Sequence, residues 1–264
     1  MQRPRIYKTE AVILKQVPIG EADRILTLFT ASSGKIKAVA KGIRRPKSRI
    51  GGHLEPLSHC RLMLARGRSL DVISSAETIH SFPKVKEQLE GIARGLICVE
   101  LVDAFTAEEQ TNIEILHLLI ESLEWLESGE QDLVIRFFEF HLLQNLGYMP
   151  ELHYCVICRS AITPNQHAFS SSMGGTICFS CLHSQKNTVL WDSMRNPTFP
   201  ISLNALKVLR FIQRTPYREL RTLHLDDRVA GELERLTHRY ISYLLERQIK
   251  SVKFLEKVKL PHIY

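Results

Sequence analysis

The sequence predicts an α+β chain of several domains, in which a five-stranded β-barrel precedes an all-α helical domain with an inserted four-cysteine zinc module. Three observations lead to this prediction. Short β-rich runs fill residues 1–80, apolar residues recur at helical spacing from residue 84, and two Cys-x-x-Cys pairs follow at 155–158 and 178–181. A chain of 264 residues is long enough to build two or three hydrophobic cores.

The N-terminal domain, predicted over residues 1–80, consists of five β-rich runs. Gly, Pro and Ser cluster between the runs, as expected of short strands joined by turns. The runs cover residues 11–15, 22–30, 35–41, 55–65 and 69–77. Five short strands within one small domain predict a barrel.

The third run, KIKAVAK, continues into a polar and basic loop. Because side chains alternate between the two faces of a strand, Ile36, Ala38 and Ala40 share one face and the lysines share the other. The lysine face and the loop form the predicted DNA-binding site, which consists of Lys35, Lys37, Lys41, Arg44, Arg45, Lys47 and Arg49. Clustered cations of this kind bind phosphates. A solvated strand edge, where lysines prevent aggregation, remains the alternative.

Helical periodicity begins near residue 84 and predicts a helical bundle over residues 84–150. Apolar residues recur at three- and four-residue steps, as they do on the buried face of a helix. The predicted helices cover residues 87–109, 112–128 and 132–147. Residues 84–154 hold 4 basic and 14 acidic residues, whereas residues 1–83 hold 15 basic and 6 acidic ones. Such opposite charge indicates different partners for the two regions.

Two more helices are predicted over residues 203–214 and 228–249. They define a C-terminal region, 200–248, whose helices should pack back onto the bundle, and residues 249–264 are assigned to a tail. Four arginines in this region are either a second DNA contact or a solvated helix face, and the sequence favours neither: Arg210, Arg214, Arg218 and Arg221.

The compartment follows from what the sequence lacks. Charged residues interrupt the N-terminus where a secretory signal needs an apolar core. No apolar run approaches the roughly 20 residues that cross a bilayer. We therefore expect a cytoplasmic, nucleoid-associated protein without membrane contact.

The four cysteines of the region 151–190 are Cys155, Cys158, Cys178 and Cys181. In a reducing cytosol disulfides are disfavoured, and two Cys-x-x-Cys pairs at this separation are typical of a structural zinc site. Four thiolates match the tetrahedral preference of Zn²⁺ and leave no open position for catalysis. Two redox-active pairs are the alternative, although neither pair follows a strand and opens a helix as in a thioredoxin-like site.

Enzyme signatures are missing from the chain. It contains no P-loop, no GxGxxG and no Ser-His-Asp pattern. The pairing of His-x-Glu with Pro-Cys-x-x-Cys that zinc deaminases use is also missing, since no Pro precedes either Cys-x-x-Cys. We predict no catalytic residue and a protein that is not an enzyme.

Three stretches carry a resemblance that spans nearly the whole chain: VILKQVPIGEADRILTLFTASSGKIKAVAKGIRRPKSR, FFEFHLLQNLGYMPELHYCVIC and ERQIKSVKFL. The most specific pieces are the Gly-Glu-x-Asp-Arg turn at Gly20 to Arg24 and the Leu-Gly-Tyr-x-Pro step at Leu146 to Pro150. These stretches resemble the RecO family of bacterial DNA repair and recombination mediators. Some relatives lack the cysteines, so the zinc prediction rests on this sequence alone.

The resemblance implies that the barrel is an OB-fold and that the protein binds single- and double-stranded DNA. It also implies that the protein anneals complementary strands, associates with RecR, and helps RecA replace the single-strand-binding protein SSB, whose acidic tail it recognises. For that tail we consider Arg136, a lone cation on an apolar helix, although the sequence favours an internal pair with a neighbouring Glu. An RNA-binding or transcription-type zinc-ribbon protein is the alternative function.

Overall fold

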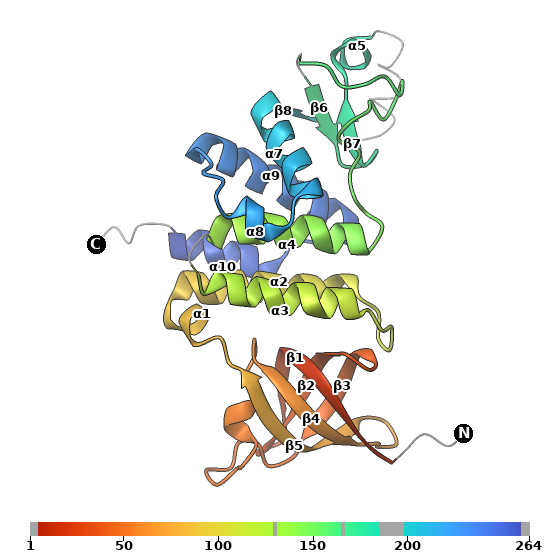
Figure 1. Cartoon of the computed structure of the whole chain (residues 1–264). Helices are drawn as coiled ribbons and strands as arrows, with labels where there is room; N and C mark the ends of the chain where they lie inside the picture. Colours follow the sequence, from red (N-terminus) through yellow and green to blue (C-terminus); the bar gives the residue numbers. More distant parts are fainter. Residues whose placement is uncertain (1–4, 129–130, 165–166, 185–197, 260–264) are drawn as a thin grey trace. The chain divides into compact units, whose positions relative to one another are not determined.

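The computed structural model describes residues 5–128, 131–164, 167–184 and 198–259 (Figure 1). It divides the chain into two compact units. The first comprises residues 1–131 together with 249–264, and the second comprises residues 132–248. The predicted bundle, 84–150, is therefore shared between the two units.

The first unit begins with five strands whose pairing closes the sheet. The strands are β1 (Ile6–Ile19), β2 (Asp23–Thr30), β3 (Gly34–Ala40), β4 (His59–Ala65) and β5 (Asp71–His80). Their order is β1-β2-β3-β5-β4, and β4 pairs again with β1, so that the sheet forms a closed barrel. All pairs are antiparallel except β3 with β5. Each of the five predicted runs overlaps one of these strands, although β1 and β5 extend beyond their runs.

The barrel interior is filled by alternate side chains of all five strands. Ile36, Ala38 and Ala40 belong to this core, which confirms the predicted apolar face of β3. Ile43, just beyond the end of β3, is only 8% exposed and packs in the same core. The basic loop that follows β3 is therefore fixed to the barrel by an apolar side chain.

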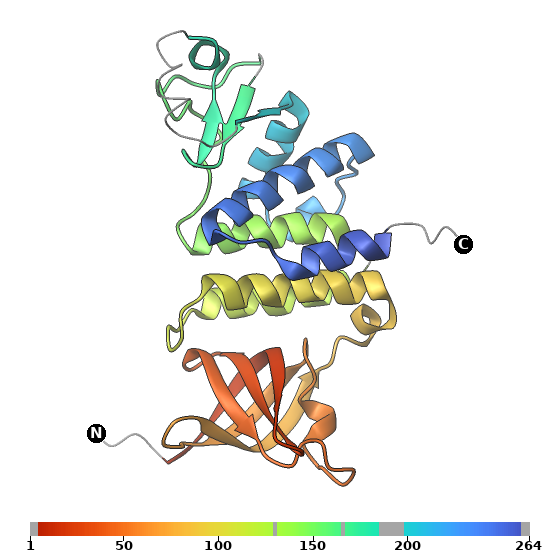
Figure 2. The same ribbon diagram turned by 180° about the vertical axis from the view of Figure 1, so that it is seen from behind.

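Four helices complete the first unit, in addition to the short 3₁₀ turn η1 (Gly51–His53). They are α1 (Pro83–Glu87), α2 (Leu89–Phe105), α3 (Ile113–Leu126) and α10 (Lys250–Lys259). Figures 1 and 2 show α10 beside α2, far from it in sequence. The segment predicted as a tail is thus helical over residues 250–259, because its apolar residues find a partner in α2. Residues 260–264 of that segment lie outside the described residues.

Glu100 of α2 holds the N-terminus of α10 in place. Its carboxylate accepts hydrogen bonds from the backbone N–H of Lys250 at 3.0 Å and of Ser251 at 2.8 Å. The Ser251 hydroxyl donates a third bond, at 2.6 Å. The first N–H groups of a helix have no intrahelical acceptor and carry a partial positive charge. A carboxylate accepts their hydrogen bonds and also offsets that charge.

The second unit combines helices with a small sheet. Its elements are α4 (Gln131–Asn145), β6 (His167–Ser170), β7 (Gly175–Ile177), α5 (Phe179–Leu182), β8 (Phe199–Ile201), α7 (Leu203–Arg214), α8 (Tyr217–Leu220) and α9 (Asp227–Leu245). The sheet order is β7-β6-β8. Phe169 of β6 packs edge-on against Tyr240 of α9, with ring centroids 5.4 Å apart, and thereby joins the sheet to the helices.

Helix α9 ends earlier than the sequence predicts. Its last residue is Leu245, and Glu246 adopts a left-handed backbone with φ of 53°. A residue in that conformation cannot continue the helix. Among the described residues, no helix combines the length and apolar character needed to cross a membrane.

The Glu100 cap can be tested by substitution. Glu100→Ala removes three hydrogen bonds at the start of α10, so the free energy of unfolding of the first unit falls by about 1–3 kcal/mol. Glu100→Gln, which retains an acceptor but loses the charge, gives a smaller loss. Urea unfolding followed by circular dichroism measures both, with Glu121→Ala on the exposed face of α3 as the control. An unchanged midpoint for Glu100→Ala would contradict this role of the carboxylate.

Candidate functional site

The four predicted metal ligands meet in the second unit. Cys155 and Cys158 lie in a turn that follows α4. Cys178 directly follows β7 and is the N-cap of α5, which contains Cys181, so the second pair does follow a strand and open a short helix, contrary to the prediction. The four sulfur atoms are all within 4.8 Å of one another, and the group contains no histidine. The Sγ atoms of Cys158 and Cys178 are 3.7 Å apart. A tetrahedral ZnS₄ centre with bonds of about 2.3 Å requires sulfurs about 3.8 Å apart, so this set fits such an ion.

The backbone around the cysteines is shaped to aim them inward. The N–H of Arg159 donates to the Cys155 carbonyl at 2.9 Å, and Arg159 itself takes a left-handed conformation with φ of 62°. In the second pair, the N–H of Leu182 donates to the Cys178 carbonyl at 2.9 Å. The Cys178 N–H in turn donates to the sulfur of Cys155 at 3.4 Å. Each pair is thus a tight turn that presents two sulfurs on one side.

The cysteine thiols differ in how readily they ionise, and a bound cation would favour the thiolate form of all of them. Hydrogen bonds from Ser160 lower the pKa of the exposed Cys158 to about 6, which favours its thiolate. Burial raises the pKa of Cys178 and Cys181. All six cysteines are free thiols, so the two predicted pairs are not disulfides. A bound divalent cation stabilises thiolates and removes the cost of ionising four of them together.

Two of the seven predicted DNA-binding cations are engaged within the first unit. The Lys35 side chain is 12% exposed, and its Nζ donates to the Asp103 carbonyl oxygen at 2.6 Å and lies 3.3 Å from the Asp103 carboxylate. Lys37 forms an exposed ion pair with Glu108, which raises the pKa of Lys37. No sequence pattern indicates these partners, because they lie 68 and 71 residues away along the chain.

The other five predicted cations form a free cluster, which we call the basic loop. It consists of Lys41, Arg44, Arg45, Lys47 and Arg49. All five side chains are exposed, and within the described part of the chain none makes an ion pair or a side-chain hydrogen bond. The loop backbone is nevertheless ordered, because the Gly42 N–H donates to the Asp23 carboxylate at 2.7 Å and the Arg44 N–H to the Ala22 carbonyl at 3.0 Å.

The Gly-Glu-x-Asp-Arg turn therefore has a structural task that the sequence analysis missed. Asp23 fixes the start of the basic loop, and the neighbouring Arg24 donates from Nη1 to the Gln16 side chain. The motif is visible in the sequence, but its partners are not, since they come from strand β1 and from the loop after β3.

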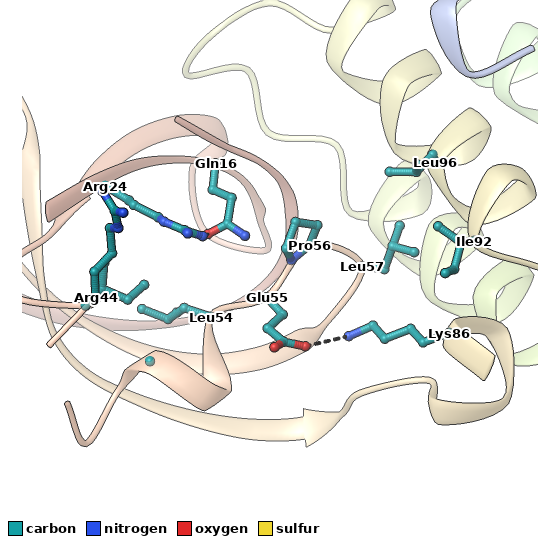
Figure 3. A pocket seen from close by; sticks show the side chains of 12 residues that line it. Gln16, Arg24, Arg44, Leu54, Glu55, Pro56, Leu57, Lys86, Ile92 and Leu96 are labelled. Atoms are coloured by element: carbon teal, nitrogen blue, oxygen red, sulfur yellow. Dashed lines mark hydrogen bonds and ion pairs between the residues drawn. The ribbon is translucent and has the colours of Figure 1, made fainter. Parts of the chain in front are cut away.

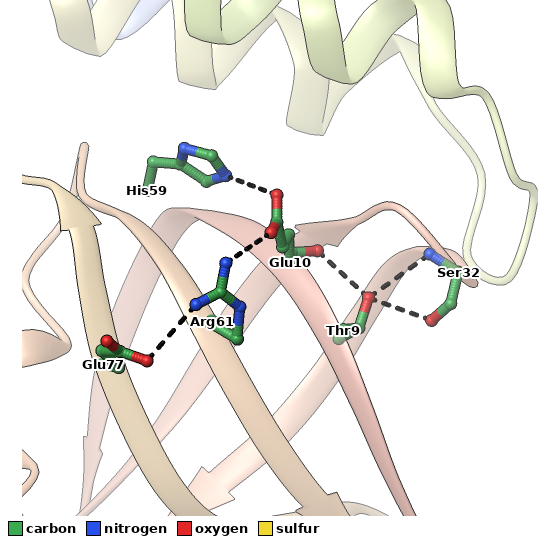
Figure 4. Close-up of polar contacts among 6 residues, drawn as sticks. All are labelled: Thr9, Glu10, Ser32, His59, Arg61 and Glu77. Atoms are coloured by element: carbon green, nitrogen blue, oxygen red, sulfur yellow. Dashed lines mark hydrogen bonds and ion pairs between the residues drawn. The ribbon is translucent and has the colours of Figure 1, made fainter.

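On strands β1, β4 and β5 of the barrel, an arginine is paired with acidic side chains (Figure 4). Arg61 of β4 lies between Glu10 of β1 at 3.1 Å and Glu77 of β5 at 3.4 Å. Glu10 also lies 3.5 Å from the ring of His59, whose pKa is lowered by burial. Arg61 is therefore engaged with two carboxylates, unlike the cations of the basic loop.

Arg136 lies inside the second unit. It is 5% exposed, and its Nη1 contacts the Glu139 carboxylate at 2.9 Å and donates to the Thr237 hydroxyl. Burial raises the pKa of Glu139 to about 7, although the charge of Arg136 opposes the shift. The geometry therefore agrees with the internal pair rather than with an exposed peptide site.

Of the four C-terminal arginines, two contact the segment before the first cysteine pair and two are exposed. Arg210 of α7 donates from Nε and Nη2 to the Leu152 carbonyl, at 3.0 and 2.6 Å. Arg214 lies 3.2 Å from the His153 ring nitrogen. These two hold the segment that enters the first cysteine pair. Arg218 and Arg221 are exposed.

Comparison with known proteins finds separate family matches for the barrel and for the rest of the chain. Residues 1–82 match the family described as "Recombination protein O N terminal", and residues 86–253 match "Recombination protein O C terminal". The chain is 34% identical to the "DNA repair protein RecO" of Dehalococcoides mccartyi strain CBDB1, over 98% of this chain and 99% of that protein.

Two further relatives give the same result. The chain is 34% identical to the "DNA repair protein RecO" of Roseiflexus sp. strain RS-1, over 97% of this chain and 87% of that protein. It is 33% identical to the protein of that name from Pelotomaculum thermopropionicum, over 96% and 94% of the two chains. With matches over both regions and almost the full length, the chain belongs to the RecO family of DNA repair proteins.

Proposed function

We propose that the protein is a DNA-binding recombination mediator that acts by binding and not by breaking bonds. The observation that carries this proposal is the basic loop: five exposed cations on an ordered loop, to which the described residues supply no ion-pair partner. Such a cluster binds phosphates of single or double strands and does not read bases. We further propose that the barrel is an OB-fold, a five-stranded Greek-key barrel used widely for nucleic acids.

Strand annealing follows from the same electrostatics. Two complementary strands repel each other through their phosphates, and a cationic surface reduces that repulsion while leaving base edges free to pair. We propose that the protein anneals strands in this way and, with RecR, helps RecA load on DNA coated with SSB. The resemblance of the chain to recombination mediators supports these partners.

The metal is proposed to be one structural Zn²⁺ per chain. The sulfurs of Cys155, Cys158, Cys178 and Cys181 have the separations of a ZnS₄ centre, and all-thiolate sites leave no position for a catalytic water. The apolar cluster around them is small, with Cys155, Ile177 and Cys181 as its buried members. The ion would therefore supply much of the stability of this part of the second unit.

Removing one ligand tests the zinc proposal. Purified protein holds about one zinc per chain, and Cys178→Ser lowers that content and exposes the cysteine turns to proteolysis. Structural zinc contributes about 10–16 kcal/mol of apparent binding free energy at neutral pH, so its loss is large compared with domain stability. Elemental analysis and limited proteolysis measure the two effects, with Cys98→Ser as the control. Metal-free protein with intact thiols, prepared without chelator, would refute the proposal.

Salt dependence tests the basic loop as the DNA contact. The variant Arg45→Ala/Lys47→Ala/Arg49→Ala weakens binding equally for unrelated sequences, because phosphate contacts carry no sequence information. For single strands the slope of log K against log[salt] becomes less negative by about 2, at about 0.7 per lost contact. Fluorescence anisotropy over a salt series measures both quantities.

The control for that experiment removes the same number of positive charges elsewhere in the first unit. Lys84, Lys253 and Lys257 are exposed lysines away from the basic loop, and their triple Ala variant should retain the wild-type slope. If the two triple variants behave alike, only net charge matters and the loop is not the contact.

For Arg136 we propose a structural role, which a pH series can test. Arg136→Met leaves Glu139 buried without a counter-ion and destabilises the second unit by about 3–5 kcal/mol at neutral pH. Because the folded pKa of Glu139 is raised to about 7, protonation favours the folded state. The stability contributed by this group is present below the unfolded pKa and is lost as the pH rises through about 7.

Arg136→Met should therefore recover much of its stability at acidic pH, and the double variant Arg136→Met/Glu139→Gln should recover it at neutral pH. Thermal unfolding at several pH values measures this. We also expect the folded double variant to bind a peptide of the SSB tail as the wild type does. A specific loss of peptide binding would restore Arg136 as a partner contact.

A further inference from the structure

A cleft of about 570 Å³ opens in the first unit between the end of the barrel and helices α1 and α2 (Figure 3). Volumes of this order are usual for small-ligand sites. Arg24 and Arg44 lie at one end of the cleft, and Leu57, Ile92 and Leu96 lie at the other. Only Arg44 belongs to the basic loop, so the rest of the lining has no assigned part in DNA binding.

The cationic end contains a donor without an acceptor. Arg24 lies opposite Ala40 in the register of β2 and β3, in phase with the inward-facing Leu26. Its Nη1 is used by Gln16, but its Nε–H is buried and, among the described residues, has no hydrogen-bond partner. The side edge of a guanidinium is well suited to two oxygens of a phosphate or carboxylate. The exposed Arg44 adds a second positive charge at this end of the cleft.

The other end is aliphatic. Leu57 is only 2% exposed, and Ile92 and Leu96 are neighbours on one face of α2. The charged pair on this side, Lys86 with Glu55 at 3.7 Å, is self-neutralised and leaves no free charge near the aliphatic wall. The lining therefore suits a molecule with an anionic group at one end and an apolar face at the other.

We propose that this cleft binds one unpaired nucleotide of a DNA strand, with its phosphate at Arg24 and Arg44 and its base against Leu57, Ile92 and Leu96. This rests on the proposed function, because Arg44 is shared with the basic loop and a strand following that loop reaches the cleft directly. In a duplex the base would first have to leave its stack and its partner, which costs free energy. The cleft thus favours single strands over duplexes.

Filling the cleft without changing charge tests the proposal. Leu96→Trp fills the aliphatic end, so that the base no longer fits, and should weaken binding of a single-stranded oligonucleotide about tenfold, or about 1.4 kcal/mol. Binding of a hairpin duplex and the salt slope stay unchanged. A 2-aminopurine in the single strand brightens on binding to the wild type, as its base leaves the stack, and does so less with Leu96→Trp. Leu89→Trp is the control, since Leu89 is 59% exposed on the same helix and outside the cleft.

A second variant, Arg24→Lys, keeps the charge but removes the guanidinium edge, and it should also weaken only single-strand binding. Circular dichroism checks folding of both variants. Wild-type protein that binds neither DNA would overturn the proposed function. Wild-type binding to both DNAs, with both variants matching it, would overturn only the nucleotide site. Loss of binding to a peptide with a free terminal carboxylate, with DNA binding intact, would make the cleft a peptide site and would likewise overturn the proposal.

Discussion

The contact between strand β3 and the loop that joins α2 to α3 determines how the first unit presents its charge. The Glu109 N–H donates to the Lys35 carbonyl at 2.9 Å, so the loop continues the sheet by one short bridge. Gly34 makes this possible, because a Cβ there would lie 1.8 Å from the Gln110 carbonyl oxygen. Gly34 also has a φ of 64°, which other residues rarely adopt. This contact thereby fixes the barrel against the helices of the same unit.

That contact sorts the cations of β3 into two groups. Lys35 and Lys37 meet Asp103 and Glu108, acids supplied by the end of α2 and the following loop. The cations beyond the strand's end have no such neighbours and remain available to a ligand. An acidic helical region next to a basic barrel is therefore not merely a difference of composition. Two of its acids neutralise Lys35 and Lys37, so the exposed cations beyond β3 are the members of the predicted DNA-binding set that stay available.

The cysteine region of the second unit has few apolar residues to bury, so its stability must come from other interactions. Two tight turns bring four sulfurs within 4.8 Å of one another, and Arg210 holds the carbonyl of Leu152 just before the first turn. The buried Arg136–Glu139 pair lies among the helices of the same unit. Both features cost desolvation energy and stay favourable only while every partner is present. The stability of the second unit therefore depends on specific pairs of polar groups and on the four-thiol group, whereas that of the barrel depends on a continuous apolar core.

Periodicity and spacing in the sequence determined the local structure. The strand periods gave the inward face of Ile36, Ala38 and Ala40, and the spacing of the cysteines gave the four-thiol group, because both depend on residues that are close along the chain. The order of the strands, the pairing of α10 with α2 and the division of the bundle between two units depend on distant contacts, which no local pattern records.

The same distinction holds for the candidate site. The sequence alone identified the basic residues of the barrel and marked the turn at Gly20 to Arg24. Only the tertiary structure decided that Lys35 and Lys37 are paired, that Arg136 is buried with Glu139, and that Arg24 keeps an unpartnered donor in a cleft. A charge is visible in the sequence, but its availability depends on which acids and which apolar surfaces the fold brings against it, often across many tens of residues.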